Sequence, residues 1–153
     1  MRLSLLFLSL AVLSSGLPQG EQQPIIHVKH LESPVRYPPL ARQTHMTGTI
    51  LVKLTIDADG TVRKTESSVG DKNTLGFDLL KEDAERIVKS WTFGCTGCPP
   101  NAPFEHTIKF VYKIETEATA PSLRVVMNLP DDITISTDVY APQPSNNSKK
   151  GRH

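Results

Sequence analysis

The sequence lacks the charge imbalance that marks many nucleic-acid-binding proteins. Its 153 residues carry 17 basic and 16 acidic side chains, so the formal net charge is +1, and no basic block or stripe interrupts the chain. Proteins that bind nucleic acid neutralise phosphates with clustered lysine and arginine, so this class has no electrostatic support here. The small cluster of Lys149, Lys150 and Arg152 lies in a polar terminus, where a solvated tail is the simpler interpretation.

The sequence also lacks the short motifs of common catalytic and metal centres. It has no GxSxG, no P-loop and no HExxH. On a strand, His27 and His30 would point to opposite faces, which is poor geometry for sharing a metal ion. Asp57 and Asp59 resemble the start of a calcium loop, but Ser68 stands where that loop needs its last glutamate. We therefore expect a protein that is not an enzyme and that has no cofactor and no metal site.

No apolar run is long enough for an ordinary membrane span. A spanning helix needs about 20 apolar residues, and the run over residues 3–13 is much shorter. Arg2 precedes this run and the small residues 14–16 follow it, as in a secretory signal peptide with its cleavage site. We expect cleavage after Gly16 and export to the periplasm or cell envelope. The alternative is an uncleaved leader that is kept as an anchor.

Hydrophobic periodicity predicts one small α+β domain in the remaining chain. The clearest strand has Ile50, Val52, Leu54 and Ile56 on one face, and the clearest helix carries one apolar stripe that ends at Trp91. In chain order, the pattern predicts a short strand over 25–31, a helix over 38–45, strands over 49–56 and 61–69, a helix over 79–90 and a strand over 105–115. A glycine-, cysteine- and proline-rich loop over 94–103 precedes the last of these strands.

The predicted strands and helices fit a two-layer fold. A sheet with one apolar face needs helices to cover that face. The strand over 49–56 is the most apolar and should be central, with the polar strand over 61–69 at one edge and the strand over 105–115 at the other. The sequence therefore predicts a three-stranded, antiparallel-type sheet covered by helices.

The order and spacing of these features resemble the C-terminal domain of the TonB family. The resemblance extends from about Val35 to Ile114 and includes a Tyr-Pro pair, a glycine that opens the central strand, an Asp-Gly turn and an aromatic pair after the main helix. The residues that carry it are Tyr37, Pro38, Ala41, Gly48, Asp59, Gly60, Ala84, Val88, Trp91, Phe93, Phe110 and Ile114.

The resemblance implies a periplasmic domain that binds protein or peptide partners. Such domains add an extended partner segment as an extra strand at an open sheet edge, where main-chain hydrogen bonds give affinity and side-chain pockets give selectivity. The implied edge lies in the strand over 105–115 and comprises Thr107, Ile108, Lys109, Phe110, Val111, Tyr112 and Lys113. An outer-membrane transporter is the partner that the family suggests.

Two departures from the family keep the partner's identity open. A transducer of this family has a membrane helix and a long proline-rich spacer, whereas this chain has a short leader and almost no spacer before Tyr37. Where TonB has a glutamine-containing stretch that touches its partner, this chain has Ser33, Pro34, Val35 and Arg36.

Cys95 and Cys98 are the only cysteines, and a disulfide is the expected state of such a pair in an exported protein. The alternatives are a redox-active pair, a zinc site and unpaired thiols. A redox pair of the thioredoxin type opens a helix, but Pro99 and Pro100 follow here. Zinc needs about four ligands, and the sequence has no second CxxC.

The segment beyond the resemblance predicts an extra hairpin. Leu123 to Leu129 and Ile133 to Val139 both alternate, with Pro130 between them; a mobile tail with some apolar residues is the alternative. We expect this hairpin to cover the predicted edge at least in part and to compete with partner strands. Truncation after Glu117 should then raise affinity for a transporter's N-terminal peptide or promote a homodimer through the freed strand.

Together these interpretations divide the chain into five parts: a signal peptide over 1–16, an N-terminal segment over 17–34, a TonB C-terminal-like domain over 35–117, a hairpin extension over 118–141 and a polar tail over 142–153. The predicted function is partner binding by strand addition in the periplasm, with a link to outer-membrane transport. The alternatives are a thiol–disulfide redox protein that uses the CxxC pair and a structural protein of the envelope.

Overall fold

The computed structural model describes residues 23–74, 76–118 and 123–140. The predicted signal peptide and polar tail lie outside these residues. The elements are β1 (Ile25–Leu31), α1 (Pro39–Gln43), β2 (Gly48–Ile56), β3 (Val62–Val69), α2 (Phe77–Lys89), β4 (Trp91–Thr96), β5 (Phe104–Ala118), β6 (Leu123–Asn128) and β7 (Asp132–Tyr140).

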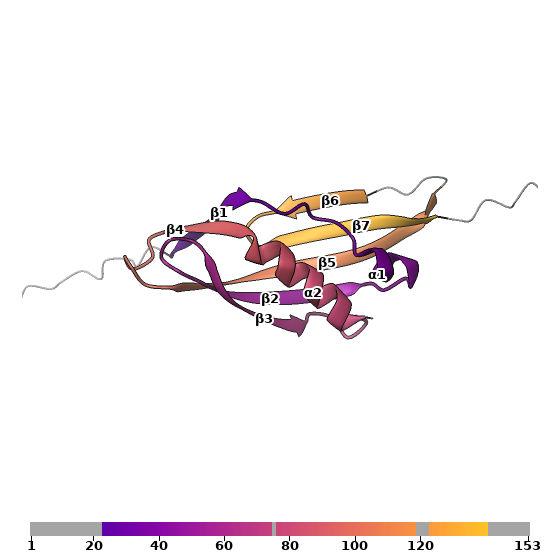
Figure 1. Ribbon diagram of the computed structural model, residues 1–153, viewed down its shortest axis with the longest axis horizontal. Helices are drawn as coiled ribbons and strands as arrows, with labels where there is room; N and C mark the ends of the chain where they lie inside the picture. The colour runs from indigo at the N-terminus through magenta and orange to yellow at the C-terminus, as the bar shows by residue number, and fades with distance from the viewer. Residues whose placement is uncertain (1–22, 75, 119–122, 141–153) are drawn as a thin grey trace, which may run out of the picture.

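The protein is an α+β fold, as expected, but its main sheet has five strands and not three. The strand order is β3-β2-β5-β7-β6, and β1 and β4 form a separate two-stranded sheet. Helix α2 lies across one face of the main sheet (Figure 1); we call this the helix-side face. The predicted three-stranded sheet was too small because the C-terminal hairpin joins the same sheet.

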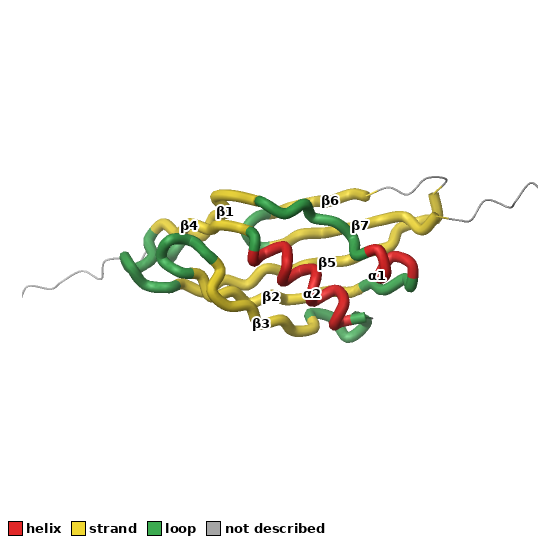
Figure 2. Tube along the Cα trace, viewed as in Figure 1, coloured by secondary structure: helices red, strands yellow, loops and turns green. Residues whose placement is uncertain are grey.

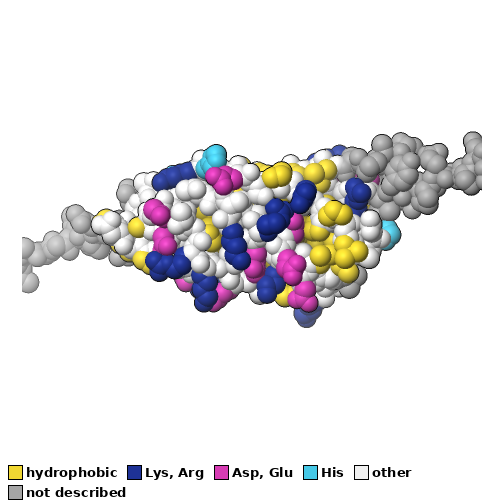
Figure 3. All heavy atoms as spheres, viewed as in Figure 1, with side chains coloured by type: hydrophobic (Ala, Val, Ile, Leu, Met, Phe, Trp, Pro, Cys, Tyr) yellow, Lys and Arg dark blue, Asp and Glu magenta, His cyan; other side chains and the backbone are white. Residues whose placement is uncertain are grey.

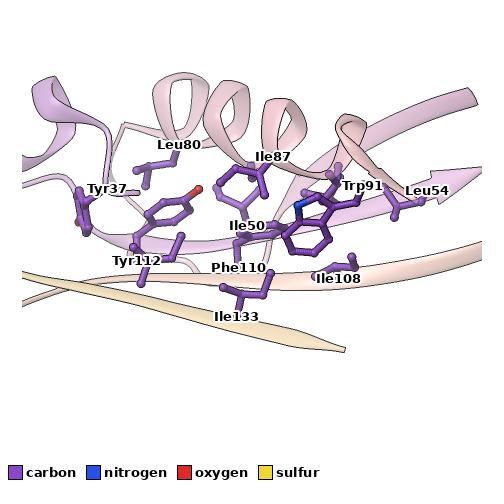
Figure 4. Close-up of a cluster of buried hydrophobic side chains, with 14 of the residues drawn as sticks. Tyr37, Ile50, Leu54, Leu80, Ile87, Trp91, Ile108, Phe110, Tyr112 and Ile133 are labelled. Atoms are coloured by element: carbon purple, nitrogen blue, oxygen red, sulfur yellow. The ribbon is translucent and has the colours of Figure 1, made fainter. Parts of the chain in front are cut away.

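The core lies between α2 and the helix-side face. The alternation predicted for β2 is confirmed, since Ile50, Val52, Leu54 and Ile56 are fully buried. The apolar stripe of α2 buries Leu80, Ala84, Ile87 and Val88 against them. Figure 4 shows Leu80 and Ile87 on the helix side of this core and Ile50 and Phe110 on the sheet side. Hydrophobic burial between the two layers therefore provides the main stabilisation of the fold.

The sequence prediction missed strand β4, whose residues were assigned in part to a loop. Trp91 and Phe93 alternate inward and are buried, and β4 pairs antiparallel with β1, with Val28 opposite Phe93. The alternating pattern in β4 is too short to predict a strand. Its partner β1 is distant in sequence and mostly exposed, so β1 does not reveal the pairing either. Gly60, in the turn between β2 and β3, also contacts β4: it accepts a hydrogen bond from the Phe93 N–H at 2.9 Å, and a Cβ at Gly60 would lie 2.1 Å from the Phe93 carbonyl oxygen.

The strand over 105–115 is not an edge strand, which corrects the sequence prediction. It is part of β5, which pairs antiparallel with β2 on one side and parallel with β7 on the other. The chain passes from β5 to β6, turns, and returns along β7, which inserts between β5 and β6. Alternation within one strand does not reveal such a parallel neighbour, because the pairing depends on how a later segment folds back.

Candidate protein-interaction edges

The residues predicted to bind a partner strand lie in the interior of the sheet. Ile108, Phe110 and Tyr112 are buried on the helix-side face, while Thr107, Lys109, Val111 and Lys113 lie on the opposite face. Strand β2 flanks this segment on one side, and β7 flanks it on the other side from Lys109 onward. A partner strand would have to displace one of them before it could pair with β5.

Burial and local contacts hold the C-terminal hairpin on β5. Ile133 and Ile135 of β7 are fully buried in the main core. At the hairpin turn, the Lys109 N–H donates to the Asp131 carbonyl oxygen at 2.9 Å, and the His106 Nε2 lies 3.1 Å from the Pro130 carbonyl oxygen. The expectation that the hairpin covers this edge is confirmed. Its action as a competitor of partner strands remains a prediction.

Among the described residues, the sheet ends at β3 and at β6. The sequence places β3 at an edge correctly, and its composition suits exposure. Lys64 forms an ion pair with Glu66 at 2.5 Å, and Arg63 forms one with Asp57. Charged side chains on an edge strand discourage unwanted pairing with other chains. Strand β3 is therefore protected against indiscriminate pairing with other chains.

Strand β6 is a different kind of edge. Leu123, Val126 and Met127 are 51%, 56% and 39% exposed, respectively. Its one charged side chain, Arg124, donates to Glu115 of β5 at 3.1 Å. Hydrophobic side chains gather along the rim of the molecule where β6 runs, and a second group lies over α1 and the start of α2 (Figure 3). Strand β6 therefore has little of the protection seen on β3.

The aromatic residue of the predicted Tyr-Pro pair anchors the N-terminal segment to the core. The Tyr37 ring meets the Tyr112 ring edge to face at 5.6 Å, and its hydroxyl donates to the Met46 carbonyl oxygen at 2.5 Å. Burial raises the pKa of Tyr37 to about 12. The connection from β1 to α1 lies on the same side of the sheet as α2 (Figure 2), where Ser33 accepts a hydrogen bond from Arg86 at 2.7 Å.

A partly buried polar contact links β5 to α2 beside this anchor. The Tyr112 hydroxyl donates to Asp83 Oδ2 at 3.2 Å, and Arg86 pairs with Asp83 at 2.6 Å. Burial raises the pKa of Tyr112, and the neighbouring Asp83 carboxylate raises it further. Both tyrosines therefore stay neutral at physiological pH, and both hold elements in place.

The remaining residues predicted from the motif also serve the fold. Ala41, Ala84, Val88, Trp91 and Phe93 are buried in the core. Asp59 caps the turn between β2 and β3, where its carboxylate accepts from the backbone N–H and the hydroxyl of Thr61. These two hydrogen bonds lower the pKa of Asp59. The motif thus identifies residues that build the fold and does not itself mark a binding surface.

Cys95 and Cys98 form a disulfide at the end of β4. Cys95 is the last residue but one of that strand, and the chain continues through Pro99 and Pro100 toward β5. The pair does not open a helix, so the feature that lowers the thiol pKa in thioredoxin-type motifs is missing here. Within the described ranges, no group of three or more potential ligands is placed to hold a metal ion, and His27 and His30 are both exposed.

The part of the chain that the structure describes contains no helix that could span a membrane. The fold defines a class: a small α+β domain whose five-stranded sheet, among the described residues, ends at β3 and β6. The model of the Gram-negative bacterial TonB protein C-terminal family matches residues 33–114, and the chain belongs to this family. The domain family is periplasmic and mediates protein interactions without enzymatic activity.

The comparison with curated proteins finds no match. The family match ends at Ile114, so both arms of the C-terminal hairpin, β6 and β7, lie beyond it. The strand that fills the predicted binding edge is therefore an addition to the part of the chain that the family defines.

Proposed function

We propose that this protein is an exported, non-enzymatic protein-binding domain of the periplasm, which takes up an extended segment of a partner as an extra strand. Membership of the TonB C-terminal family supports protein binding and the compartment. The predicted signal peptide supports export. We further propose that the partners act in outer-membrane transport, as the family name suggests.

The observation that carries the proposal is the position of β7 beside β5. Because the chain's own hairpin fills that edge, the partner segment adds at an outer edge of the five-stranded sheet. As an end strand, β3 has backbone N–H and C=O groups on its outer side that no strand of the sheet pairs with. The charged side chains of this strand are Arg63, Lys64 and Glu66. Main-chain hydrogen bonds would supply affinity there, and the charged side chains would select a partner of complementary charge.

Site-specific photocrosslinking in intact cells tests this proposal. A photoreactive residue replaces Arg63 on β3 or Val126 on β6, and a matched control replaces Lys89, which is exposed on α2. We expect crosslinks from β3 to one contiguous segment of an envelope protein and none to that segment from α2. N-terminal sequencing of the same material should begin after Gly16.

Two results would count against the proposal. Crosslinks that form equally well from α2 would mean that the sheet edge does not select the partner. A chain that retains Met1 would remove the argument for a cleaved leader and favour an anchor.

The redox alternative gains no support from the site. A catalytic pair cycles between thiol and disulfide and alkylates readily when reduced; here the disulfide lies in a strand-to-loop connection and not at the start of a helix. The flanking prolines and the absence of a helix at Cys95 favour a structural role.

A further inference from the structure

We propose that β6 is a self-association edge, through which two copies of this chain pair antiparallel about a two-fold axis and join their five-stranded sheets. This inference goes beyond partner binding, because it concerns a strand outside the segment that matches the family. The occupant of the edge is a second copy of the same chain. Such a pairing is isologous, so that each copy offers the same strand to the other.

The two ends of the sheet differ in a way that suits this arrangement. Strand β3 is protected by charged side chains, whereas β6 exposes Leu123, Val126 and Met127. An apolar, unprotected edge strand is prone to open-ended pairing. Pairing β6 with a second β6 buries both apolar edges and leaves a protected β3 at each end of the joined sheet.

The faces of the strand limit the possible registers, and we propose the one centred on Val125 because it brings together the exposed Leu123 and Met127. A two-fold axis perpendicular to the sheet requires that residues opposite one another lie on the same face. Val125 lies on the helix-side face, since it pairs with the buried Ile135 of β7. If Val125 faces its own copy, then Leu123 faces the partner's Met127. These two exposed apolar side chains lie on the same helix-side face. Because of the two-fold symmetry, the contact between them occurs twice in the dimer.

The charge pattern agrees with this register. Arg124 is the one charged residue among the six of β6, and Glu115 on the neighbouring β5 already binds it. In the proposed pairing, Arg124 lies opposite the partner's Val126, so no two like charges face each other. Strand β6 can thus pair with itself by apolar contacts without placing like charges opposite each other.

Sedimentation of the full chain over a range of concentrations tests the pairing. We expect a reversible monomer–dimer equilibrium for the unmodified protein. The double variant L123K/M127K places lysine opposite lysine and should raise the dimer dissociation constant by about 100-fold or more. The matched variant L123K/M127E places lysine opposite glutamate and should recover dimerisation, with a dependence on salt that the unmodified protein lacks.

Val69→Lys is the control, because Val69 is 47% exposed on the opposite edge strand β3. It should leave the equilibrium unchanged. A monomer at all concentrations overturns the proposal, as does a dimer that L123K/M127K leaves intact or that L123K/M127E fails to recover. Circular dichroism checks that every variant is folded. The test uses this protein alone, so its outcome is independent of crosslinking to a partner at Arg63.

Discussion

Ile133 and Ile135 lie on the helix-side face of β7, and both are fully buried beside β5, in a core that also contains residues of β2. A mobile tail would leave these side chains in water. Each contributes on the order of 1.5–3 kcal/mol through burial of its apolar surface. At the scale of single residues, the C-terminal hairpin is therefore part of the core of the domain.

Replacing Ile133 with alanine measures that contribution. The variant Ile133→Ala should lower the free energy of unfolding by about 2–5 kcal/mol, because it leaves a cavity under the sheet. Val69→Ala, at an exposed position on β3, should change it by no more than about 0.5 kcal/mol. Urea denaturation followed by circular dichroism gives both values. If both variants lower the free energy of unfolding by the same small amount, β7 is only loosely attached to the domain.

Sequence reasoning succeeds for residues whose burial follows from their own strand or helix. The alternation of β2 and the stripe of α2 correctly predict Ile50, Val52, Leu80 and Ala84 as core residues. Ile133 has the same pattern within β7, but the pattern does not show which strand it lies beside. That information resides in the way the hairpin folds back, and it cannot be derived from local periodicity.

At the scale of elements, the connection from β4 to β5 contains the disulfide. Strand β4 pairs with β1. The disulfide links Cys95, near the end of β4, to Cys98 in the connection that follows. The sequence predicted the disulfide from the compartment but missed the strand that carries it. Strand β4 was missed because its six residues run directly into a loop rich in glycine and proline.

The double variant C95S/C98S should lower stability only modestly. The closed ring is very short, so the constraint on the unfolded chain is at the small end of the usual range of about 2–4 kcal/mol. Self-association through β6 should be unchanged, because β6 and β4 belong to different sheets. Alkylation of the unmodified protein followed by intact-mass measurement, with and without reductant, shows whether the disulfide is present. Two thiols that alkylate freely in the native exported protein would contradict the assignment.

At the scale of the whole molecule, the hairpin changes what the family fold can offer. The segment that matches the family ends on β5, and in isolation that strand would be the edge of the sheet. Adding β7 and β6 removes this edge and creates a new, apolar edge further out. Partner binding at β3 and self-pairing at β6 would then use opposite ends of one sheet, so a dimer could bind two partners.

Amide hydrogen exchange of the native protein, followed residue by residue by NMR, tests the central claim that the chain closes its own β5 edge. If β7 is a permanent neighbour, the amides of β5 from 109 to 113 should all be protected to a degree similar to those of the interior strand β2. The amides of β3 and β6 that point away from the sheet should exchange much faster. Rapid exchange of alternate amides along β5, together with unprotected amides over 132–138, would show that the edge is open and would contradict the account.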